Sequence, residues 1–556
     1  MSASERTPLL NDGSNVTAPS VDTPIVIPDI RKEPSKAELF WILTALWSAV
    51  FLGALDTTIV ATLVSPIGSY FNASHQASYL GTSYLLSVCC FTPLYGRLAD
   101  ILGRKGAMLV GLTFFGVGTL FCGLANSMIS LIVARAIAGM GGGGIMTVSS
   151  VAVSDLVPLK RRGLYQGLAN VLFGLGSGLG GPVGGFMNDT FGWRWAFLVQ
   201  MPVLAISIIL VIIKANVPYP MKPTTFRQKL ARIDWLGSLT LVAFVGCFLV
   251  AITLRTAEEM PWSDPMVWGL LLISGVSGVA FVLVEAYISA EPILPLRLLK
   301  QRTPLSVALS NFAVSVVAFS GLYNLPLYFS AVKLLPASEA GAHLLPNSVF
   351  LALGSLFAGW VMRATGKYWW LNVGGCASSL FACILLSRWN DNTGTFELWF
   401  DIIPSGFGMS SVVTSTLIAL ISSVSREDMA VATGISYLFR TTGQVLGVSM
   451  SGALAQSILR TQLRSRINVP NADELIREIR HSTEIIRTLE PELRDAAVAS
   501  WAIALRAVFI FNGAFAFLGM VACIPIQEFE LPSTFTSTGK SSAPPTPAES
   551  PDDAQA

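Results

Sequence analysis

The chain contains Gly96-Arg-Leu-Ala-Asp-Ile-Leu-Gly-Arg-Lys105, a short charged stretch between the two apolar runs 79–97 and 107–125. Each run is about 20 residues long, the length that crosses a hydrocarbon layer of roughly 30 Å as an α-helix. Over the 556 residues, 52% are apolar and only 13% are charged, whereas a soluble domain carries about 25% charged residues. A surface so poor in charge does not suit water on all sides, so the sequence predicts an all-α, polytopic membrane protein.

The spacing of this stretch returns later in the chain. Gly96-x3-Asp100-x2-Gly103-Arg104 is matched, with the acid replaced, by Gly359-x3-Arg363-x2-Gly366-Lys367. A second pair of apolar runs shares a glycine pattern, in which Gly167, Gly176 and Gly180 correspond to Gly434, Gly443 and Gly447. Eight spans separate the members of each pair. The sequence therefore predicts two related six-helix bundles with two inserted helices, and a substrate site at the bundle interface near the middle of the membrane.

Fourteen membrane spans are expected in this arrangement. They lie at about 40–64, 79–97, 107–125, 129–150, 166–187, 195–213, 235–254, 266–287, 306–329, 341–362, 369–386, 398–420, 430–455 and 504–526. The corresponding regions are a leader at 1–38, the N-terminal bundle at 39–213, a linker with the inserted spans at 214–305, the C-terminal bundle at 306–531 and a tail at 532–556. Leader and tail are rich in Ser, Pro, Thr and Asp, which predicts disorder.

Lys and Arg concentrate in the loops on the side of Arg97, Arg104 and Lys105, which predicts that this side and both termini are cytosolic. The outer segment 457–503 is long and carries Arg and Glu with Ile and Leu at helical intervals. We interpret it as an amphipathic helix on the membrane surface, with a substrate-capturing lid as the alternative. Two N-x-[ST] tripeptides, at Asn72 and Asn188, fall in outer loops and are candidate glycosylation sites.

Two ionisable residues stand inside predicted spans at similar depth. Asp56 lies about 12 Å and Arg135 about 9 Å from the outer ends of their spans, at about 1.5 Å per residue. Ionisable groups inside a membrane are costly and usually functional. Burial disfavours the charged carboxylate and a nearby guanidinium favours it, so Asp56 could load and release a proton. The alternative is a static ion pair that locks two helices together.

Arg440 lies near the middle of the predicted span 430–455. Its guanidinium could hold an anionic group of the substrate, or it could brace Asp56 or a backbone carbonyl. Polar residues of the C-terminal bundle are candidates for the cavity lining, although each of them could instead form a helix–helix hydrogen bond. They are Asn311, Tyr323, Asn324, Asn347, Tyr437 and Gln444.

Glycine dominates parts of the spans 129–150 and 166–187. Small residues allow helix backbones to approach closely, so we interpret Gly139, Gly181 and Gly185 as packing positions. Pro182 is additionally a candidate hinge, because proline can interrupt a membrane helix.

The sequence lacks a nucleotide-binding motif, which bears on the energy source for transport. No G-x-x-x-x-G-K-[ST] motif occurs, which disfavours ATP-driven transport by this chain alone. We therefore expect a proton gradient rather than a cofactor as the energy source, with a small-molecule substrate, protons and the lipid bilayer as partners. The seven cysteines form no C-x-x-C pair, so no metal site is indicated. A net charge of +2 gives no reason to expect a nucleic-acid partner.

These features resemble the major facilitator superfamily, in particular its fourteen-span drug:proton antiporter branch, over about residues 40–526. The most specific likeness is the stretch Gly96–Lys105. Leu55-Asp-Thr-Thr58 resembles the motif of the first span, and Arg135-Ala-Ile-Ala-Gly139 that of the fourth, where the arginine is implicated in proton transfer. Gly178-x-x-Gly-Pro-Val-Gly-Gly185 resembles the antiporter motif, with one residue fewer between the proline and the paired glycines, which leaves the direction of exchange open.

By this resemblance, Asp100 and Arg104 belong to a cytosolic charge network that holds the outward-open state and breaks as the bundles rock. Within the branch, the N-terminal half resembles fungal vacuolar amino-acid transporters, including the basic amino-acid group, at Pro93–Asp100 and Ser154–Val157. In the leader, Glu5, Leu9 and Leu10 fit an acidic dileucine signal that sorting adaptors read in the cytosol.

The resemblance thus implies an antiporter, not an enzyme, which moves amino acids, favouring basic ones, across the vacuolar membrane. A plasma-membrane exporter of drugs or toxins is the first alternative, and a transporter-like sensor is the second.

Overall fold

The structure is a computed structural model that describes residues 35–71, 79–215, 233–257, 260–289, 293–294, 296–335, 339, 343–390, 393–425, 427–467, 472–481 and 485–529. The proposed sorting signal at Glu5, Leu9 and Leu10, the sequon at Asn72 and the tail 532–556 lie outside the described residues.

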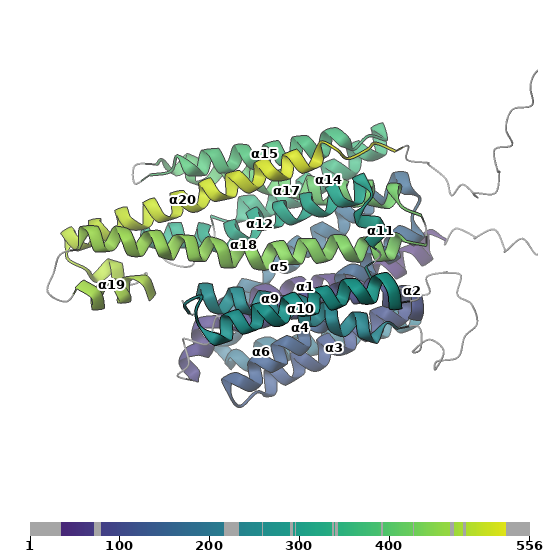
Figure 1. Cartoon of the computed structure of the whole chain (residues 1–556), viewed down its shortest axis with the longest axis horizontal. Coiled ribbons are helices and arrows are strands. Elements are labelled where there is room, and N and C mark those ends of the chain that lie inside the picture. The colour runs from purple at the N-terminus through teal and green to yellow at the C-terminus, as the bar shows by residue number, and fades with distance from the viewer. Residues whose placement is uncertain are drawn as a thin grey trace, which may run out of the picture.

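The N-terminal bundle lies below the C-terminal bundle in Figure 1, with its helix axes running along the same direction. Gly103, at a φ of 81°, turns the chain between the second and third helices. Ser127 and Ser130 form a reciprocal cap at the start of the fourth helix, which satisfies its first free N–H groups. The elements are α1 (Lys36–Tyr70), α2 (Tyr79–Leu102), α3 (Arg104–Leu124), α4 (Met128–Leu156), α5 (Leu159–Phe191), α6 (Trp193–Leu198) and α7 (Gln200–Lys214).

Two inserted helices follow, and the C-terminal bundle comes after them. The inserted pair is α9 (Trp235–Ala257) and α10 (Pro265–Leu283), continued by the π-helix η2 (Val284–Ile288). The remaining elements are α11 (Leu296–Leu299), α12 (Arg302–Ala331), α14 (Leu345–Thr365), α15 (Trp369–Ser387), α16 (Thr395–Phe400), α17 (Ile403–Ser423), α18 (Met429–Arg466), α19 (Ala472–His481), the 3-10 helix η3 (Ile485–Thr488) and α20 (Pro491–Cys523).

Close glycine contacts confirm that the two bundles repeat one packing scheme. A Cβ added to Gly176 of α5 would meet Phe51 O of α1, and a Cβ on Gly443 of α18 would meet Phe312 O of α12. Four residues further along, Gly180 and Gly447 likewise press on Leu55 and Val316. The pair α1–α5 therefore corresponds to α12–α18.

The other helices of the bundles correspond in the same way. Gly141 of α4 packs against Gly111 O of α3, and Gly408 of α17 packs against Gly375 O of α15. The pair α3–α4 therefore corresponds to α15–α17, which places the residues of the two bundles in register.

Twelve helical segments among the described residues are long and apolar enough to cross a membrane. The helices α5 and α18, although 33 and 38 residues long, are not among them. Both contain many small residues, mainly Gly in α5 and Gly, Ser and Thr in α18, and several of these glycines pack against the backbones of neighbouring helices.

The segment predicted as a membrane-surface helix, 457–503, instead extends the C-terminal bundle. It contains the end of α18, α19, η3 and the first turns of α20, at the left of Figure 1. On α19, Ile476 and Ile479 are 4% and 0% exposed, and they share a core with Leu459 of α18 and Trp501 of α20. The apolar face of α19 is thus buried in protein, which corrects the expected membrane-surface helix.

Candidate functional site

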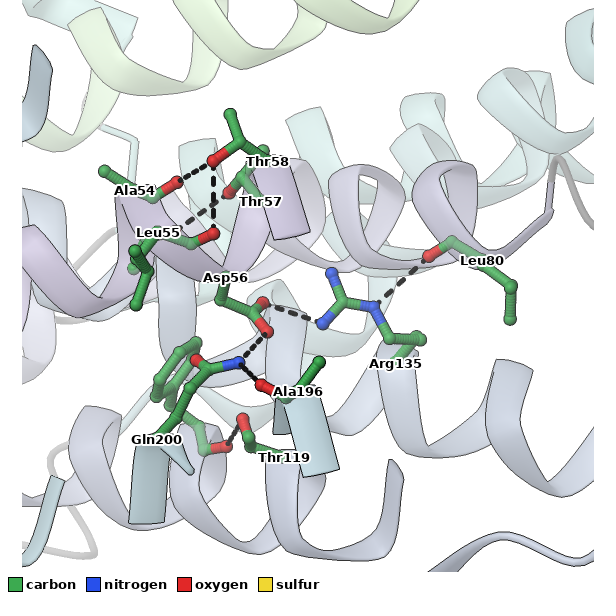
Figure 2. Close-up of polar contacts among 12 residues, drawn as sticks. Ala54, Leu55, Asp56, Thr57, Thr58, Leu80, Thr119, Arg135, Ala196 and Gln200 are labelled. Carbon is green, nitrogen blue, oxygen red and sulfur yellow. Dashed lines mark hydrogen bonds and ion pairs between the residues drawn. The ribbon is translucent and has the colours of Figure 1, made fainter. Parts of the chain in front are cut away.

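An ion pair between α1 and α4 lies inside the N-terminal bundle, where the sequence predicts it. Arg135 Nη1 donates to Asp56 Oδ2 at 2.7 Å, and the two side chains are 1% and 0% exposed. Arg135 Nε also donates to Leu80 O at 3.3 Å (Figure 2), and its guanidinium stacks 4.4 Å from the ring centre of Tyr84. Three helices therefore surround one buried carboxylate.

A fourth helix contacts the same carboxylate through a residue that the sequence analysis missed. Gln200, at the start of α7, is 1% exposed, and its Nε2 donates to Asp56 Oδ1 at 3.4 Å and to Ala196 O at 3.1 Å (Figure 2). A single amide at the start of the apolar run 195–213 was the signal available in the sequence.

A second charge cluster lies at the end of the bundles that holds the α2–α3 turn, which we call the loop end. Arg104 Nη1 donates to Asp100 Oδ1, and its Nε donates to Asp155 Oδ2, both at 2.7 Å. These three residues join the ends of α2, α3 and α4. The sequence predicts Asp100 and Arg104 as partners in a charge network, whereas Asp155 was noted only for its resemblance to vacuolar transporters.

The two basic neighbours of this cluster take different positions. Lys105 Nζ donates to Ile212 O at the end of α7. Arg97 is half-buried and lies near Glu285 of η2, beside the inserted helices. The predicted charged loop is therefore divided between the N-terminal bundle and the inserted pair.

At the loop end the two bundles touch through glycine. A Cβ on Gly96 of α2 would lie 2.8 Å from Ala430 O of α18, and a Cβ on Gly359 of α14 would lie 2.6 Å from Gly163 O of α5. These two contacts are related by the internal repeat. Such close approach is possible only without side chains, so the glycines of the repeated stretch seal the seam between the bundles.

Hydrogen bonds continue this seam from the loop end towards the middle of the helices. Ser150 Oγ of α4 and Tyr437 OH of α18 are 2.7 Å apart, and Asn170 Nδ2 of α5 donates to Ser355 Oγ of α14 at 2.8 Å. Cys89 Sγ of α2 lies 3.2 Å from Thr442 Oγ1. These contacts hold the loop-end half of the interface closed.

Arg440 lies on α18 one turn beyond Tyr437, and its Cζ is 5.5 Å from the centre of that ring. Among the residues that the structure describes, Arg440 forms no ion pair, and its buried Nε has no hydrogen-bond partner. The predicted brace to Asp56 is not formed, because Asp56 is occupied by Arg135 and Gln200. An unpaired guanidinium at the seam has capacity left for an anionic group.

Two predicted cavity residues belong to the interior of the C-terminal bundle instead. Asn311 is 3% exposed, and its Nδ2 donates to Val307 O at 3.0 Å and Thr416 Oγ1 at 3.2 Å. Asn324 is 4% exposed and donates to Ser451 Oγ at 3.0 Å. Both amides join helices within one bundle, since a buried polar group must find a partner there. They are therefore not accessible cavity residues in this conformation.

The other cavity candidates are distributed along the interface helices. Gln444 is half-buried on α18 and Tyr323 is 47% exposed on α12, so both remain accessible. Asn347 lies at the start of α14, where its backbone and side-chain oxygens pack against Gly406 of α17. Tyr437 is engaged with Ser150 across the seam.

The predicted packing and hinge positions of the N-terminal bundle are all helical. Gly139 presses on Tyr84 O of α2, which confirms its packing role. Gly181 and Gly185 lie in α5, which continues as helix through Pro182 to Phe191, so the predicted break at Pro182 is absent. Asn188 lies in the last turn of the same helix. Among the described residues no group of three or more His, Cys, Asp or Glu could hold a metal ion.

Two paired helical bundles, a closed seam and buried charges inside one bundle define a membrane transporter. The family model of the Major Facilitator Superfamily matches residues 46–448. The chain belongs to this superfamily, as the resemblance implied.

Fungal relatives cover most of the chain. It is 39% identical to the multidrug resistance protein fnx1 of Schizosaccharomyces pombe, over 92% of this chain and 97% of the relative. It is 37% identical to the vacuolar membrane amino acid uptake transporter fnx2 of the same species, over 88% and 84%. The identity to the vacuolar basic amino acid transporter 1 of Saccharomyces cerevisiae is 33%, over 76% and 79%. The second and third of these relatives are named as transporters.

Solved structures agree on the fold. The human organic anion transporter MFSD10 has a TM-score of 0.56 at 13% identity, covering 87% of this chain and 99% of that one. The proton:xylose symporter XylE has a TM-score of 0.54 at 14% identity, covering 86% and 95%.

Proposed function

We propose that the protein is a proton-coupled antiporter that moves amino acids, with basic ones favoured, into the vacuole by alternating access. The observation that carries this proposal is the Asp56–Arg135 pair, which is fully enclosed by α1, α2, α4 and α7. A static clamp between two helices needs no contact from a further helix, whereas here Gln200 of α7 also donates to the carboxylate and Leu80 O of α2 accepts from the guanidinium. A group that changes its protonation state needs partners for both states, and this site has them.

Arg440 is proposed to receive the carboxylate of the amino acid. Its side chain lies on the seam, next to Tyr437 and one turn before Gln444, with donors that no described residue uses. A guanidinium binds a carboxylate with two parallel hydrogen bonds, which gives it an advantage over other cations. All amino acids carry this carboxylate, whatever their side chain. The contact therefore supports amino acids as the substrate class.

The loop end is proposed to face the cytosol, with both termini on that side, and the far end to face the vacuolar lumen. Lys and Arg concentrate at the loop end, in agreement with the charge bias of membrane proteins. The closed loop-end seam then corresponds to a lumen-facing state of the carrier. The proton gradient drives exchange without a bound cofactor, and the substrate leaves as Asp56 takes up a lumenal proton.

We further propose that α5 and α18 also cross the membrane, which gives fourteen spans. Each has the length to do so, and each packs along a helix that is itself a candidate span, α1 and α12 respectively. The vacuolar location is supported by two relatives that are named as vacuolar transporters. It is also supported by the dileucine signal at Glu5, Leu9 and Leu10, which sorting adaptors would bind.

The second candidate function is export of drugs or toxins at the plasma membrane, favoured by the likeness to the multidrug resistance protein fnx1. The two functions are separated with purified protein in liposomes that are acidic inside. Labelled lysine should accumulate and ethidium should not, and Asp56→Asn should abolish the accumulation. Accumulation of ethidium without lysine would favour the exporter.

The location is tested with a fluorescent tag on the full chain. We expect the tagged protein on the vacuolar membrane and a Leu9→Ala, Leu10→Ala variant at the cell surface. Plasma-membrane residence of the unmodified chain would argue against the vacuolar assignment.

A further inference from the structure

The contact between Gln200 and Asp56 differs from the ion pair because the Gln200 amide carries both a donor and an acceptor. Arg135 of α4 donates a hydrogen bond to Asp56 Oδ2, and Gln200 of α7 donates one to Oδ1. Each carboxylate oxygen therefore has a separate partner. The carbonyl oxygen of the amide, Gln200 Oε1, is buried and has no hydrogen-bond partner among the described residues. An unused acceptor therefore lies on the same amide group as the donor that binds the carboxylate (Figure 2).

A carboxyl group that takes up a proton changes its hydrogen-bonding needs. The ionised form only accepts, whereas the protonated form must also donate its O–H. Of the two side chains that hydrogen-bond Asp56 among the described residues, Arg135 has donors only. The other titratable groups facing the site are Tyr84 of α2 and Cys122 of α3, both against the Arg135 guanidinium. An amide differs from all of these because it carries a strong donor and a strong acceptor on one planar group.

We propose that Gln200 is the positioning residue that lets Asp56 hold a proton without losing its hydrogen bond. With Asp56 ionised, Gln200 Nε2–H donates to Oδ1, as in this structure. When a proton binds Oδ1, the Gln200 amide flips about its Cγ–Cδ bond, so that Oε1 and Nε2 exchange places. Oε1 then accepts a hydrogen bond from the new O–H. The N–H···O bond to Oδ1 is replaced by an O–H···O bond, the bond from Nε2 to Ala196 O is given up while the amide is turned, and the reverse turn restores both when the proton leaves.

The packing around Gln200 favours this exchange. The amide nitrogen and oxygen are similar in size, so the two orientations of the amide occupy the same space. The stem is fixed because Gln200 begins α7 and is 1% exposed. The inference rests on the proposed proton coupling through Asp56, and it adds the group that makes both protonation states acceptable in a buried site.

The test is an infrared titration of the full-length protein in detergent, which needs no substrate. The C=O stretch of protonated Asp56 is followed against pH and assigned by its loss in Asp56→Asn. Gln200→Met keeps the length of the side chain and removes both the donor and the acceptor. Because hydrogen bonds to a charged group are the stronger ones, we expect the midpoint of the titration to rise by about one pH unit. The C=O frequency of the acid should rise as well, because its O–H loses an acceptor.

Two further variants make the result specific. Gln200→Asn is polar but too short to reach Asp56, so it should behave like Gln200→Met, and it is available if the methionine variant does not fold. Ser207→Ala is the matched control, since Ser207 lies two turns along α7 and donates to Ser48 Oγ of α1 at 2.9 Å. That variant weakens the same helix pair without touching Asp56 and should leave the midpoint unchanged.

An unchanged midpoint and frequency in both Gln200 variants would overturn the proposal, as would an equal shift in Ser207→Ala. Failure of the transport function itself looks different. In that case Asp56→Asn would still accumulate lysine in acidic liposomes, whatever the infrared titration of the Gln200 variants gives.

Discussion

The N-terminal and C-terminal bundles share their packing but not their chemistry. Phe51 of α1 and Phe312 of α12 occupy matching positions in the two bundles. Five residues further along, Asp56 therefore corresponds to Val317. Counting six residues back from the matched glycines of α4 and α17 pairs Arg135 with Ile402, which is 0% exposed. Where one bundle buries a carboxylate and a guanidinium, the other buries two aliphatic side chains.

The same contrast holds at the loop end. The register set by the matched glycines Gly111 and Gly375 pairs Arg104 with Tyr368, one residue beyond the Lys367 that the sequence repeat matches to it, and the register of Gly141 and Gly408 pairs Asp155 with Ser422. The N-terminal contact is a 2.7 Å ion pair, and the C-terminal contact is a hydrogen bond of 3.1 Å between Tyr368 OH and Ser422 Oγ. Glu528 strengthens the C-terminal side, since its Oε1 accepts from the backbone N of Tyr368 at 2.8 Å.

The two bundles therefore share the residues that set helix packing and differ in the residues that carry charge. Helix geometry depends on small residues at repeated positions, so both bundles kept their glycines. Buried charge is tolerated only where it is paired, and it responds to protons. The N-terminal bundle therefore holds the buried ion pairs, while the C-terminal bundle offers neutral hydrogen bonds and, on the seam, Arg440, which forms no ion pair with any described residue.

The largest expected effect comes from removing the charge that only the N-terminal bundle has. Asp56→Asn should reduce lysine accumulation in acidic liposomes to the level without a gradient. It should also destabilise the protein by about 3–5 kcal/mol, because Arg135 is left buried and unpaired. Thermal unfolding in detergent measures the second effect.

Two comparisons sharpen this first prediction. Asp56→Asn combined with Arg135→Gln should recover much of the stability but none of the accumulation. Val317→Ala, at the matching position of the C-terminal bundle, should keep the accumulation. Concentrative uptake by Asp56→Asn would refute the assignment of the proton site.

The loop-end contacts should differ in strength between the bundles. Asp155→Asn breaks a buried ion pair with Arg104, which keeps its second partner Asp100, and should cost about 1.5–3 kcal/mol. Ser422→Ala removes a neutral hydrogen bond and should cost about 0.5–1.5 kcal/mol. Spin labels at the exposed loop-end residues Arg161 and Thr365 report the separation of the bundles, and the first variant should widen it more. Equal distances in both variants would mean that the ion pair does not hold the gate.

A more selective effect is expected for Arg440. Arg440→Gln should weaken lysine binding by about 10–150-fold, because one charge-assisted contact of about 1.5–3 kcal/mol is lost. Cadaverine, which is lysine without the carboxylate, should bind both forms equally. Calorimetric titration of both ligands measures this, and an equal loss for the two would show a structural role of Arg440 instead.

The last expected effect comes from the glycine seam. Gly359→Ala adds a methyl group 2.6 Å from Gly163 O, so the seam must open slightly, at a cost of about 1–3 kcal/mol. Gly374→Ala is the control, since a Cβ there meets nothing within 4 Å. The same spin-label pair should lengthen only in Gly359→Ala. If both variants keep the parent distance, the glycine contact does not limit closure.

Several features of the site were predictable because they are local or repeated. Asp56 and Arg135 were recognisable as charges in apolar runs at matching depths, and the structure confirms their contact. Gln200 was not recognised, because an amide in an apolar run gives no sign of which helix it faces. Asn311 and Asn324 form the helix–helix hydrogen bonds that the sequence left open as the alternative to a cavity role, because both sides of an interface helix can carry polar residues.

The sequence alone determined the membrane class, the helical architecture and the internal repeat, since apolar run length and glycine spacing are properties of the chain. It also identified the two partners of the buried ion pair. Only the tertiary structure decided which side of each helix faces the seam, that α19 packs on protein, and that Asp56 has a second partner on α7. Those features depend on the rotation and tilt of helices that are far apart in sequence, and no local pattern fixes these angles.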